Sequence, residues 1–315
     1  MNPLTGVRGR RGRFAACALA AAAMVALPRG VRADSSRGGA FMLPGYGARA
    51  WGMAGAVIAR IDDESAVDWN PAGLALAPRM AGASYVELIP GSYYTQSQAT
   101  YTMPLGHRRD AETGVERLAA GAMYTNVSAD LGAGQTYTEN HLRLALAYSP
   151  QPLVTFAIAP QLFFSHSDVT NFDAWGTSFD MAARLSITPD WTAAFVGRDA
   201  FSRYAFDDGL DGPKDRQYVF GLARSNLYGV DLETDFVYAQ HGWLRSLLGA
   251  ETHYLFDRVA LRGGVGWLRV GEARTAYSFG ASVRAARRLY VHYGAFLDDQ
   301  DAFGPLQRFS LAVRF

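Results

Sequence analysis

The stretch "DDESAVDWNPAG", residues 62–73, gathers the side chains with the most obvious chemistry. It holds four acids, Asp62, Asp63, Glu64 and Asp68, ahead of an Asn-Pro-Ala sequence. Clustered carboxylates can bind a metal ion or work as general acid and base. Acids at the start of a short helix can instead cap free amides and complement the helix dipole. Because a proline disfavours helical geometry in the residue before it, the simplest interpretation is a capped short helix followed by a turn.

Histidine adds little to a catalytic interpretation. The six histidines are scattered, at positions 107, 141, 166, 241, 253 and 292, and none has metal-binding spacing to another. His166, between Ser165 and Ser167, is the one local candidate for hydrolysis, and a polar loop explains it better. The loop "DDGLDGPKD", residues 207–215, resembles a calcium loop but lacks the Glu of an EF-hand. We therefore predict a protein that is not an enzyme and has no cofactor and no metal.

The first 33 residues predict export. A head with Arg8, Arg10, Arg11 and Arg13 precedes an apolar run over residues 14–27, and Val31-Arg32-Ala33 fits a signal-peptidase site. The run is too short to span a membrane, so we expect a cleaved signal peptide, residues 1–33. Its removal takes away six Arg and the only Cys, leaving 24 basic and 29 acidic residues, a net charge of −5. A disulfide framework is then excluded, and nucleic-acid binding is not expected.

The other end of the chain carries a period of two. In "LQRFSLAVRF", the residues Phe309, Leu311, Val313 and Phe315 alternate with polar or small ones, and the chain ends on the aromatic residue. A strand with one apolar and one polar face, ending in Phe, is typical of the C-terminal signal for outer-membrane β-barrel assembly. We therefore expect a bacterial outer-membrane location, with membrane lipid and the barrel-assembly machinery as partners.

The same alternation recurs along residues 80–315 and predicts an all-β, 14-stranded antiparallel transmembrane barrel. We expect strands near residues 80–88, 93–103, 117–127, 140–149, 153–164, 176–188, 191–198, 217–225, 229–238, 247–256, 258–268, 276–285, 289–297 and 306–315. Tight turns on one rim and longer loops on the other are expected, with the turn rim facing the periplasm.

The alternation also predicts which charges face the lumen. They are Asp180, Arg184, Asp231, Glu233, Asp235 and Arg262, together with Arg143, Glu251, Arg284 and Arg308. A slip of one residue would place them in lipid, at ~2–4 kcal/mol for each Arg near the midplane, so the register is well fixed.

A barrel of this size would leak unless something filled it, since sixteen strands already leave an open channel. Residues 34–79 precede the first strand, lack the alternation and are rich in Gly and Ala, so we predict that they form an N-terminal hatch inside the lumen. We expect Arg49 or Arg60 to pair with Asp231, Glu233 or Asp235. Gly121 and Pro160 are candidates for a kink in the wall, because both residue types weaken a strand ladder.

The hatch sequence carries a family resemblance. "GARAWGMAGAVIARIDDESAVDWNPAGLALAP" resembles the N-terminal hatch of the FadL-type fatty-acid transporter superfamily, including its PorV/PorQ-type branch. The shared elements are Gly47-Ala48-Arg49-Ala50, Gly52-Met53, Asp62-Asp63, Ser65-Ala66 and Asn70-Pro71-Ala72. The resemblance implies a 14-stranded outer-membrane barrel whose hatch and gate include Arg49, Arg60, Asp62, Asp63, Asn70, Pro71 and Ala72.

Two functions remain open on this basis. The fatty-acid branch implies a conduit for small hydrophobic molecules gated by the hatch, and we favour it. The PorV/PorQ-type branch implies an accessory of protein secretion or surface assembly, with secretion-system proteins as partners. Short acidic outer loops, with Asp207, Asp208, Asp211, Asp298, Asp299 and Asp301, argue against a surface site that captures a greasy ligand.

Overall fold

The computed structural model describes residues 45–315 except for 90–93, 107–109, 111–112, 133, 169–171, 207–215, 240–241, 253–254, 256–257, 271 and 299–305. All described residues belong to one compact unit, residues 33–315. The expected signal peptide, the first part of the expected hatch (residues 34–44) and the loop 207–215 lie outside them.

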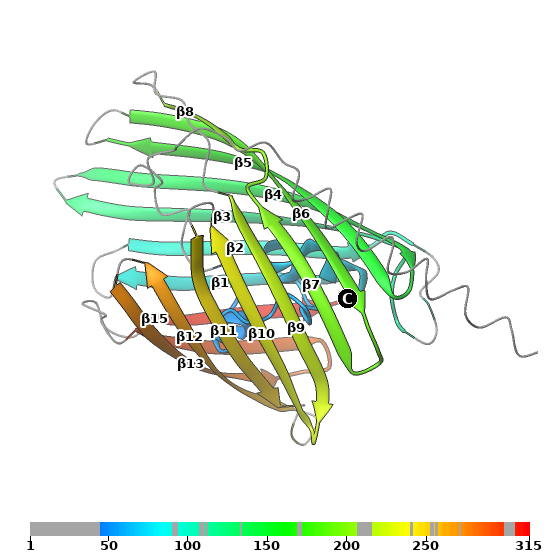
Figure 1. Ribbon diagram of the computed structural model, residues 1–315. Helices are drawn as coiled ribbons and strands as arrows, with labels where there is room; N and C mark the ends of the chain where they lie inside the picture. Colours follow the sequence, from blue (N-terminus) through cyan, green and yellow to red (C-terminus); the bar gives the residue numbers. More distant parts are fainter. Residues whose placement is uncertain are drawn as a thin grey trace, which may run out of the picture. The chain divides into compact units, whose positions relative to one another are not determined.

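Antiparallel strands make up most of the described chain (Figure 1). They are β1 (Met80–Ile89), β2 (Tyr94–Pro104), β3 (Leu118–Gly132), β4 (Gln135–Gln151), β5 (Val154–Ser167), β6 (Phe172–Ser186), β7 (Trp191–Arg198), β8 (Arg203–Phe206), β9 (Gln217–Leu227), β10 (Val230–Ala239), β11 (Gly242–Thr252), β12 (Val259–Val270), β13 (Glu272–Arg284), β14 (Leu289–Asp298) and β15 (Leu306–Arg314).

The sheet closes on itself. Consecutive strands pair with one another except around β8, where β7 pairs with β9, and β1 pairs with β15 from Met80↔Arg314 to Val86↔Arg308. The short strand β8 lies on β6 above β7, so β7 and β8 share one position in the wall. The wall is therefore a closed 14-stranded antiparallel barrel, as the alternation predicted.

Alternating side chains give the wall two different faces. In β4, Leu142, Leu144, Leu146 and Tyr148 are exposed on the outside, while the residues between them are buried toward the lumen. β15 repeats the pattern, and Phe309, Leu311, Val313 and Phe315 all point outward. An outer face that is continuously apolar is what a hydrocarbon environment requires.

The strands extend further than the sequence predicted at one rim. β3 ends at Gly132 and β4 begins at Gln135, and β10 and β11 are separated by residues 240–241 alone, so much of the expected loop sequence is strand. We call this the loop rim. The opposite, turn rim carries short connections such as residues 152–153 and 228–229. The expectation of longer loops was wrong at these two hairpins, because polar hairpins can extend beyond an apolar band without losing their ladder hydrogen bonds. It holds between Phe206 and Gln217 and between Asp298 and Leu306, where the connections are longer.

The wall is irregular between β7 and β8. Regular pairing from Gly197↔Met181 would place residue 201 opposite Thr177, but Arg203 occupies that place, so two extra residues are inserted. Asp199 adopts a positive φ of 52°, which bends the chain away from the strand direction. Among the described residues, β7 pairs with β9, whereas β8 pairs with β6 alone. We call residues 199–202 the wall break.

Residues 45–79, which we call the lumenal segment, fill the middle of the barrel (blue in Figure 1). They form three single turns, α2 (Ala48–Trp51), α3 (Ala66–Trp69) and the 3₁₀ helix η3 (Pro71–Ala75). Among the described residues, no helix has the length and hydropathy needed to cross a membrane. Trp51, Ile58, Val67 and Leu74 are fully buried against small wall residues, so the core of the molecule lies between the lumenal segment and the wall.

Candidate functional site

Backbone contacts hold α2 against the wall. A Cβ atom on Gly52 would lie 2.9 Å from the Cα atom of Gly280 in β13, so both positions need glycine for the chains to meet. The Ala48 amide donates a 2.8 Å hydrogen bond to Ser310 Oγ in β15. The segment is therefore seated on the strands that close the barrel.

An ionic cluster fixes the segment on the turn-rim side. Arg49 donates 2.7 Å bonds to Asp62 and Asp63 within the segment, and a further 2.7 Å bond to Glu251 of β11. Glu251 also accepts a 2.7 Å bond from Arg262 of β12. Burial favours the neutral form of Asp63, but Arg49 outweighs it and holds the pKa of that carboxyl below its ordinary value. Asp62 and Asp63 of the opening stretch thus serve as counter-charges for Arg49.

Two acids of β10 accept hydrogen bonds from the backbone of the segment. Asp235 accepts from the Val57 and Ile58 amides at 2.9 and 3.2 Å, and Glu233 accepts from the Ala59 amide at 2.5 Å. Arg60 forms an ion pair with Asp231 lower on the same strand. Arg184 of β6 donates to the Ala59 carbonyl at 3.2 Å. The predicted row of lumenal charges therefore lies along one side of the segment.

Asp68 lines the candidate site, although the sequence analysis named it among the four acids without giving it a hatch or lumenal role. It accepts a 2.7 Å bond from the Tyr46 amide and lies 3.1 Å from Arg143 of β4, which in turn lies 3.2 Å from Asp180 of β6. Burial would raise the pKa of Asp68, but Arg143 and Arg198 keep it below the ordinary value. The sequence feature that could have pointed to Asp68 is its position three residues before Pro71.

The Asn-Pro-Ala sequence forms a helix start. Asn70 caps η3 by accepting a 2.9 Å bond from the Ala72 amide, and its amide group donates to the Ile58 carbonyl at 2.6 Å. Pro71 occupies the first helical position, where its missing N–H costs nothing. The expected helix starting at Asp62 and Asp63 is replaced by a bend with Asp63 accepting from the Ser65 amide, and α3 begins only at Ala66.

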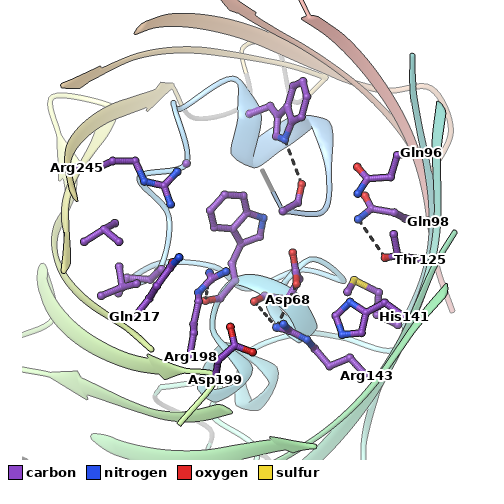
Figure 2. A pocket seen from close by; sticks show the side chains of 18 of the residues that line it. Asp68, Gln96, Gln98, Thr125, His141, Arg143, Arg198, Asp199, Gln217 and Arg245 are labelled. Carbon is purple, nitrogen blue, oxygen red and sulfur yellow. Dashed lines mark hydrogen bonds and ion pairs between the residues drawn. The ribbon is translucent and has the colours of Figure 1, made fainter. Parts of the chain in front are cut away.

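A chamber of about 290 Å³ lies between the lumenal segment and the loop rim. Its floor includes Trp69 and Ile58, and its wall includes the apolar residues Met123, Val127, Val219, Val237 and Leu247. Figure 2 shows polar groups on two opposite sides, with Arg198, Gln217 and Arg245 facing Gln96, Gln98 and Thr125. The chamber can therefore hold one compact molecule with both apolar and hydrogen-bonding surfaces.

The chamber adjoins the wall break. Arg198 at the end of β7, Asp199 in the break and Gln217 at the start of β9 all line it. Asp199 is held on the lumenal side, because its carboxylate accepts a 2.6 Å bond from Ser178 and its amide donates to Asp180 at 2.8 Å. Arg198 donates to the Trp69 carbonyl at 3.2 Å and lies over the Trp69 ring at 5.6 Å. The break, the chamber and the segment thus meet at one place.

A second cavity, about 430 Å³, lies below the segment at the turn rim. We call it the basin. Its lining includes Arg49, Asp63, Glu64, Met80 and Arg262, so it is strongly polar. The lumenal segment separates the basin from the chamber.

The remaining predicted residues lie away from this site. Gly121 stays paired with Thr102 and Ala145, and a Cβ there would meet Val67 at 2.5 Å, so it makes room for the segment. Pro160 interrupts the pairing of β5 with β4 without changing the register.

His166 is exposed and contacts Asp173 and Asp168 at 2.6 and 3.0 Å. In the described part of the chain, no cluster of His, Cys, Asp and Glu suits a metal ion.

Comparison with known proteins rests on structure, because neither a family model nor a curated protein sequence matched the chain. A solved "CymD monoaromatic hydrocarbon channel" aligns with 88% of this chain and 99% of its own, at a TM-score of 0.65 and 14% identity. The Ralstonia pickettii toluene transporter TbuX aligns with 87% of this chain and 100% of its own, at 0.62 and 13%. A Pseudomonas aeruginosa FadL homologue aligns with 86% and 98%, at 0.60 and 13%.

The chain has the FadL-type barrel fold. Near-complete coverage in both directions means that the likeness includes the whole barrel. Together with the apolar outer face, the FadL-type fold is that of an outer-membrane protein. The solved FadL-type structures are transport channels by their descriptions, and at these identities the likeness establishes the fold alone.

Proposed function

We propose that this protein is an outer-membrane conduit for the passive passage of compact hydrophobic molecules, with residues 45–79 acting as its hatch. The observation that carries the proposal is the meeting of three features: a chamber, a segment that closes it toward the turn rim, and a wall break at its side. The descriptions of the structural relatives as hydrocarbon channels support the same class of cargo.

The size of the chamber limits the cargo. An apolar cavity of about 150 Å³ is enough for benzene in a protein core, and this chamber measures about 290 Å³. Molecules with one or two rings therefore fit, with Trp69 and the aliphatic wall as contact surface. The chamber also admits cargo that carries a hydrogen-bonding substituent, because its polar groups can then bond to that substituent.

The route out of the chamber leads sideways in this proposal. The segment is anchored by the ionic cluster around Arg49 and by backbone contact at Gly280, so displacing it would break several buried interactions at once. The wall break interrupts the edge formed by β7 and β8, and β8 has a partner strand on one side alone among the described residues. A hydrophobic molecule leaving there would enter the bilayer without crossing the polar basin.

Closing the wall break tests the conduit. Deleting Phe201 and Ser202 removes the two inserted residues, so that the register of β7 on β6 continues without interruption to Arg203, which already lies opposite Thr177. We expect uptake of radiolabelled toluene by cells carrying this variant to fall to the level of cells without the barrel. Replacing the same two residues with Ala-Ala keeps the insertion and is the matched control, for which uptake should be retained.

Folding of both variants is checked by the heat-dependent shift of the barrel on SDS gels. Equal uptake by the correctly inserted deletion variant and the wild type would refute a sideways exit at this place. Toluene uptake by the wild type no faster than by cells lacking the barrel would refute the conduit itself.

The secretion-accessory alternative stays a prediction. A protein partner that co-purifies in stoichiometric amount after gentle detergent extraction would support it, whereas bound small hydrophobic molecules would support the conduit. The lipid bilayer and the barrel-assembly machinery are proposed partners in either case, on the strength of the outward row Phe309, Leu311, Val313 and Phe315.

A further inference from the structure

Arginines gather at the turn rim where the strands β12 to β15 end. The Arg284 amide donates a 2.8 Å hydrogen bond to the Arg258 carbonyl, which joins the turn-rim ends of β13 and β12. The Arg314 amide donates a 2.8 Å bond to the Arg288 carbonyl, which joins the end of β15 to the residue before β14. The four arginines therefore lie on neighbouring strands along one stretch of the rim. We call these four residues the arginine lip.

The arginine lip borders the mouth of the basin. Arg314 lines the basin, and so does Tyr290, which is paired with Arg284. Residues that face each other across two strands project from the same side of a sheet, so Arg284 is on the lumenal side. Arg258 continues the pairing of β12 with β13 and lies opposite Arg284. The lip is therefore directed toward the basin and away from the apolar outer face that membrane lipid covers.

Much of the positive charge of the lip is open to an external partner. Arg258, Arg288 and Arg314 are exposed, and none of them forms an ion pair with another residue in the described part of the chain. The sequence of this stretch of rim, residues 253–258, 284–289, 314–315 and 78–80, contains six Arg and a single acid, Asp257. With the terminal carboxylate also counted, four positive charges remain.

The loop rim carries the opposite charge. Its two longer connections, residues 207–215 and 299–305 with the adjoining Asp298, contain seven Asp and one Lys. A negatively charged partner is therefore attracted to the turn rim and repelled from the loop rim. In an outer-membrane barrel the turn rim faces the periplasm, so a partner of the lip comes from that compartment.

The length of the lip decides which kind of anion fits it. Neighbouring strands are about 4.8 Å apart, so the three steps from β12 to β15 span roughly 15 Å. A small anion would contact one or two of the arginines. An extended peptide advances about 3.3 Å per residue and covers the same span with about five residues. Because a guanidinium group matches a carboxylate in a two-point contact, several Asp or Glu side chains along such a peptide suit the lip.

We propose that the arginine lip docks an extended acidic segment of a periplasmic protein at the mouth of the basin. Carboxylates of the segment pair with Arg258, Arg288 and Arg314, as in other recognition of acidic motifs by clustered arginines. The docked protein is then held below the lumenal segment and does not reach the chamber. The inference is independent of the conduit, because none of the lip residues lines the chamber.

Fluorescence anisotropy of a labelled peptide of alternating Glu and Ser tests the proposal. The full barrel is embedded in nanodiscs of phosphatidylcholine, which leave both rims accessible and carry no net charge. We expect the peptide to bind the wild type at low salt and to bind more weakly at high salt, because salt screens exposed charges. The matched peptide of alternating Gln and Ser should not bind.

Two double variants locate the binding site. Arg258→Gln/Arg288→Gln should weaken binding about three- to tenfold, the loss expected for two exposed ion pairs. The control Arg117→Gln/Arg224→Gln removes the same charge from two exposed arginines elsewhere on the turn rim and should leave the affinity little changed. Heat-dependent migration on SDS gels checks that both variants are folded.

Four results would overturn the proposal. They are no binding by the wild type, equal losses in the two double variants, displacement of the peptide by free glutamate at the same carboxylate concentration, and retention of phosphatidylglycerol by the wild type alone in native mass spectrometry. The third would assign the lip to small anions and the fourth to lipid headgroups. Toluene uptake by Arg258→Gln/Arg288→Gln should equal that of the wild type, so the docking proposal and the conduit fail separately.

Discussion

Neighbouring acids in the lumenal segment have opposite electrostatic roles. Asp63 faces Arg49, so its pKa lies below the ordinary value and its charge stabilises the folded state. Burial raises the pKa of Glu64 well above the ordinary value, and Asp63 raises it further. Burial in the folded state thus disfavours the charged form of Glu64, whereas Arg49 favours the charged form of Asp63.

The first prediction concerns Glu64→Gln. A carboxyl whose folded pKa is raised destabilises the protein as pH rises above its unfolded value of 4.5, by at most about 1.4 kcal/mol for each pH unit. We expect the variant to be more stable than the wild type at pH 7 and equal to it below pH 4.5. Thermal unfolding followed by circular dichroism at the two pH values measures this, and an equal difference at both would contradict the assignment.

The charge of Asp63 should affect the stability of the folded protein in the opposite direction to that of Glu64. The stability it contributes is present above its unfolded pKa of 3.8 and is lost as pH falls through the lower folded value. Asp63→Asn is therefore the natural comparison for Glu64→Gln. It should destabilise the protein at pH 7, with the difference shrinking in strong acid.

At the scale of elements, the short turns of the lumenal segment depend on single capping residues. Asn70 both caps η3 and holds the Ile58 carbonyl, and it is completely buried. Asn70→Ala should cost about 1–3 kcal/mol, because it leaves two buried backbone groups unsatisfied. Urea unfolding gives the value. Asn140→Ala in β4, whose side chain bonds at the outer loop rim, is the control and should cost much less.

The sequence was most informative about strands. Alternation located the wall strands and their lumenal face, because a period of two is a local property of each strand. It missed β8, since the two residues inserted at 199–202 interrupt the pattern and "RYAF" is too short to re-establish it. The sequence pattern also assigned the first residues of β11 to a loop, because the residues before Arg245 do not alternate between apolar and polar.

The candidate site could be predicted in part. Lumenal charges such as Asp235 and Arg262 followed from alternation, and Arg60 contacts the acidic strand that was expected to receive it. The partner of Arg49 could not be derived, because Glu251 lies 202 residues away and the lumenal segment has no period to set its register. The chamber depends on how that segment folds, so its lining was beyond sequence reasoning. The gating roles of Asn70 and Pro71 stay predictions.

At the scale of the whole molecule, the lumenal segment decides whether the barrel conducts. A 14-stranded wall is wide enough to leave a lumen once its filling is removed. Deletion of residues 34–79 should therefore raise ion conductance in planar bilayers well above that of the intact protein, provided that the wall still closes. Conductance equal to that of the intact protein would contradict the hatch.

The contacts between the last strand, β15, and the first described residues have a consequence for assembly of the barrel. Arg308 of β15 bonds to the Gly45 carbonyl, 263 residues away along the chain, and lies 4.1 Å from the Trp51 ring. Contacts of such long range form late in folding, because the intervening chain must be ordered first. Seating the segment and joining β15 to β1 thus become one event. A barrel that still lacks β15 during assembly would therefore bind the lumenal segment only weakly. Closure of the wall and closure of the lumen would be completed in the same step.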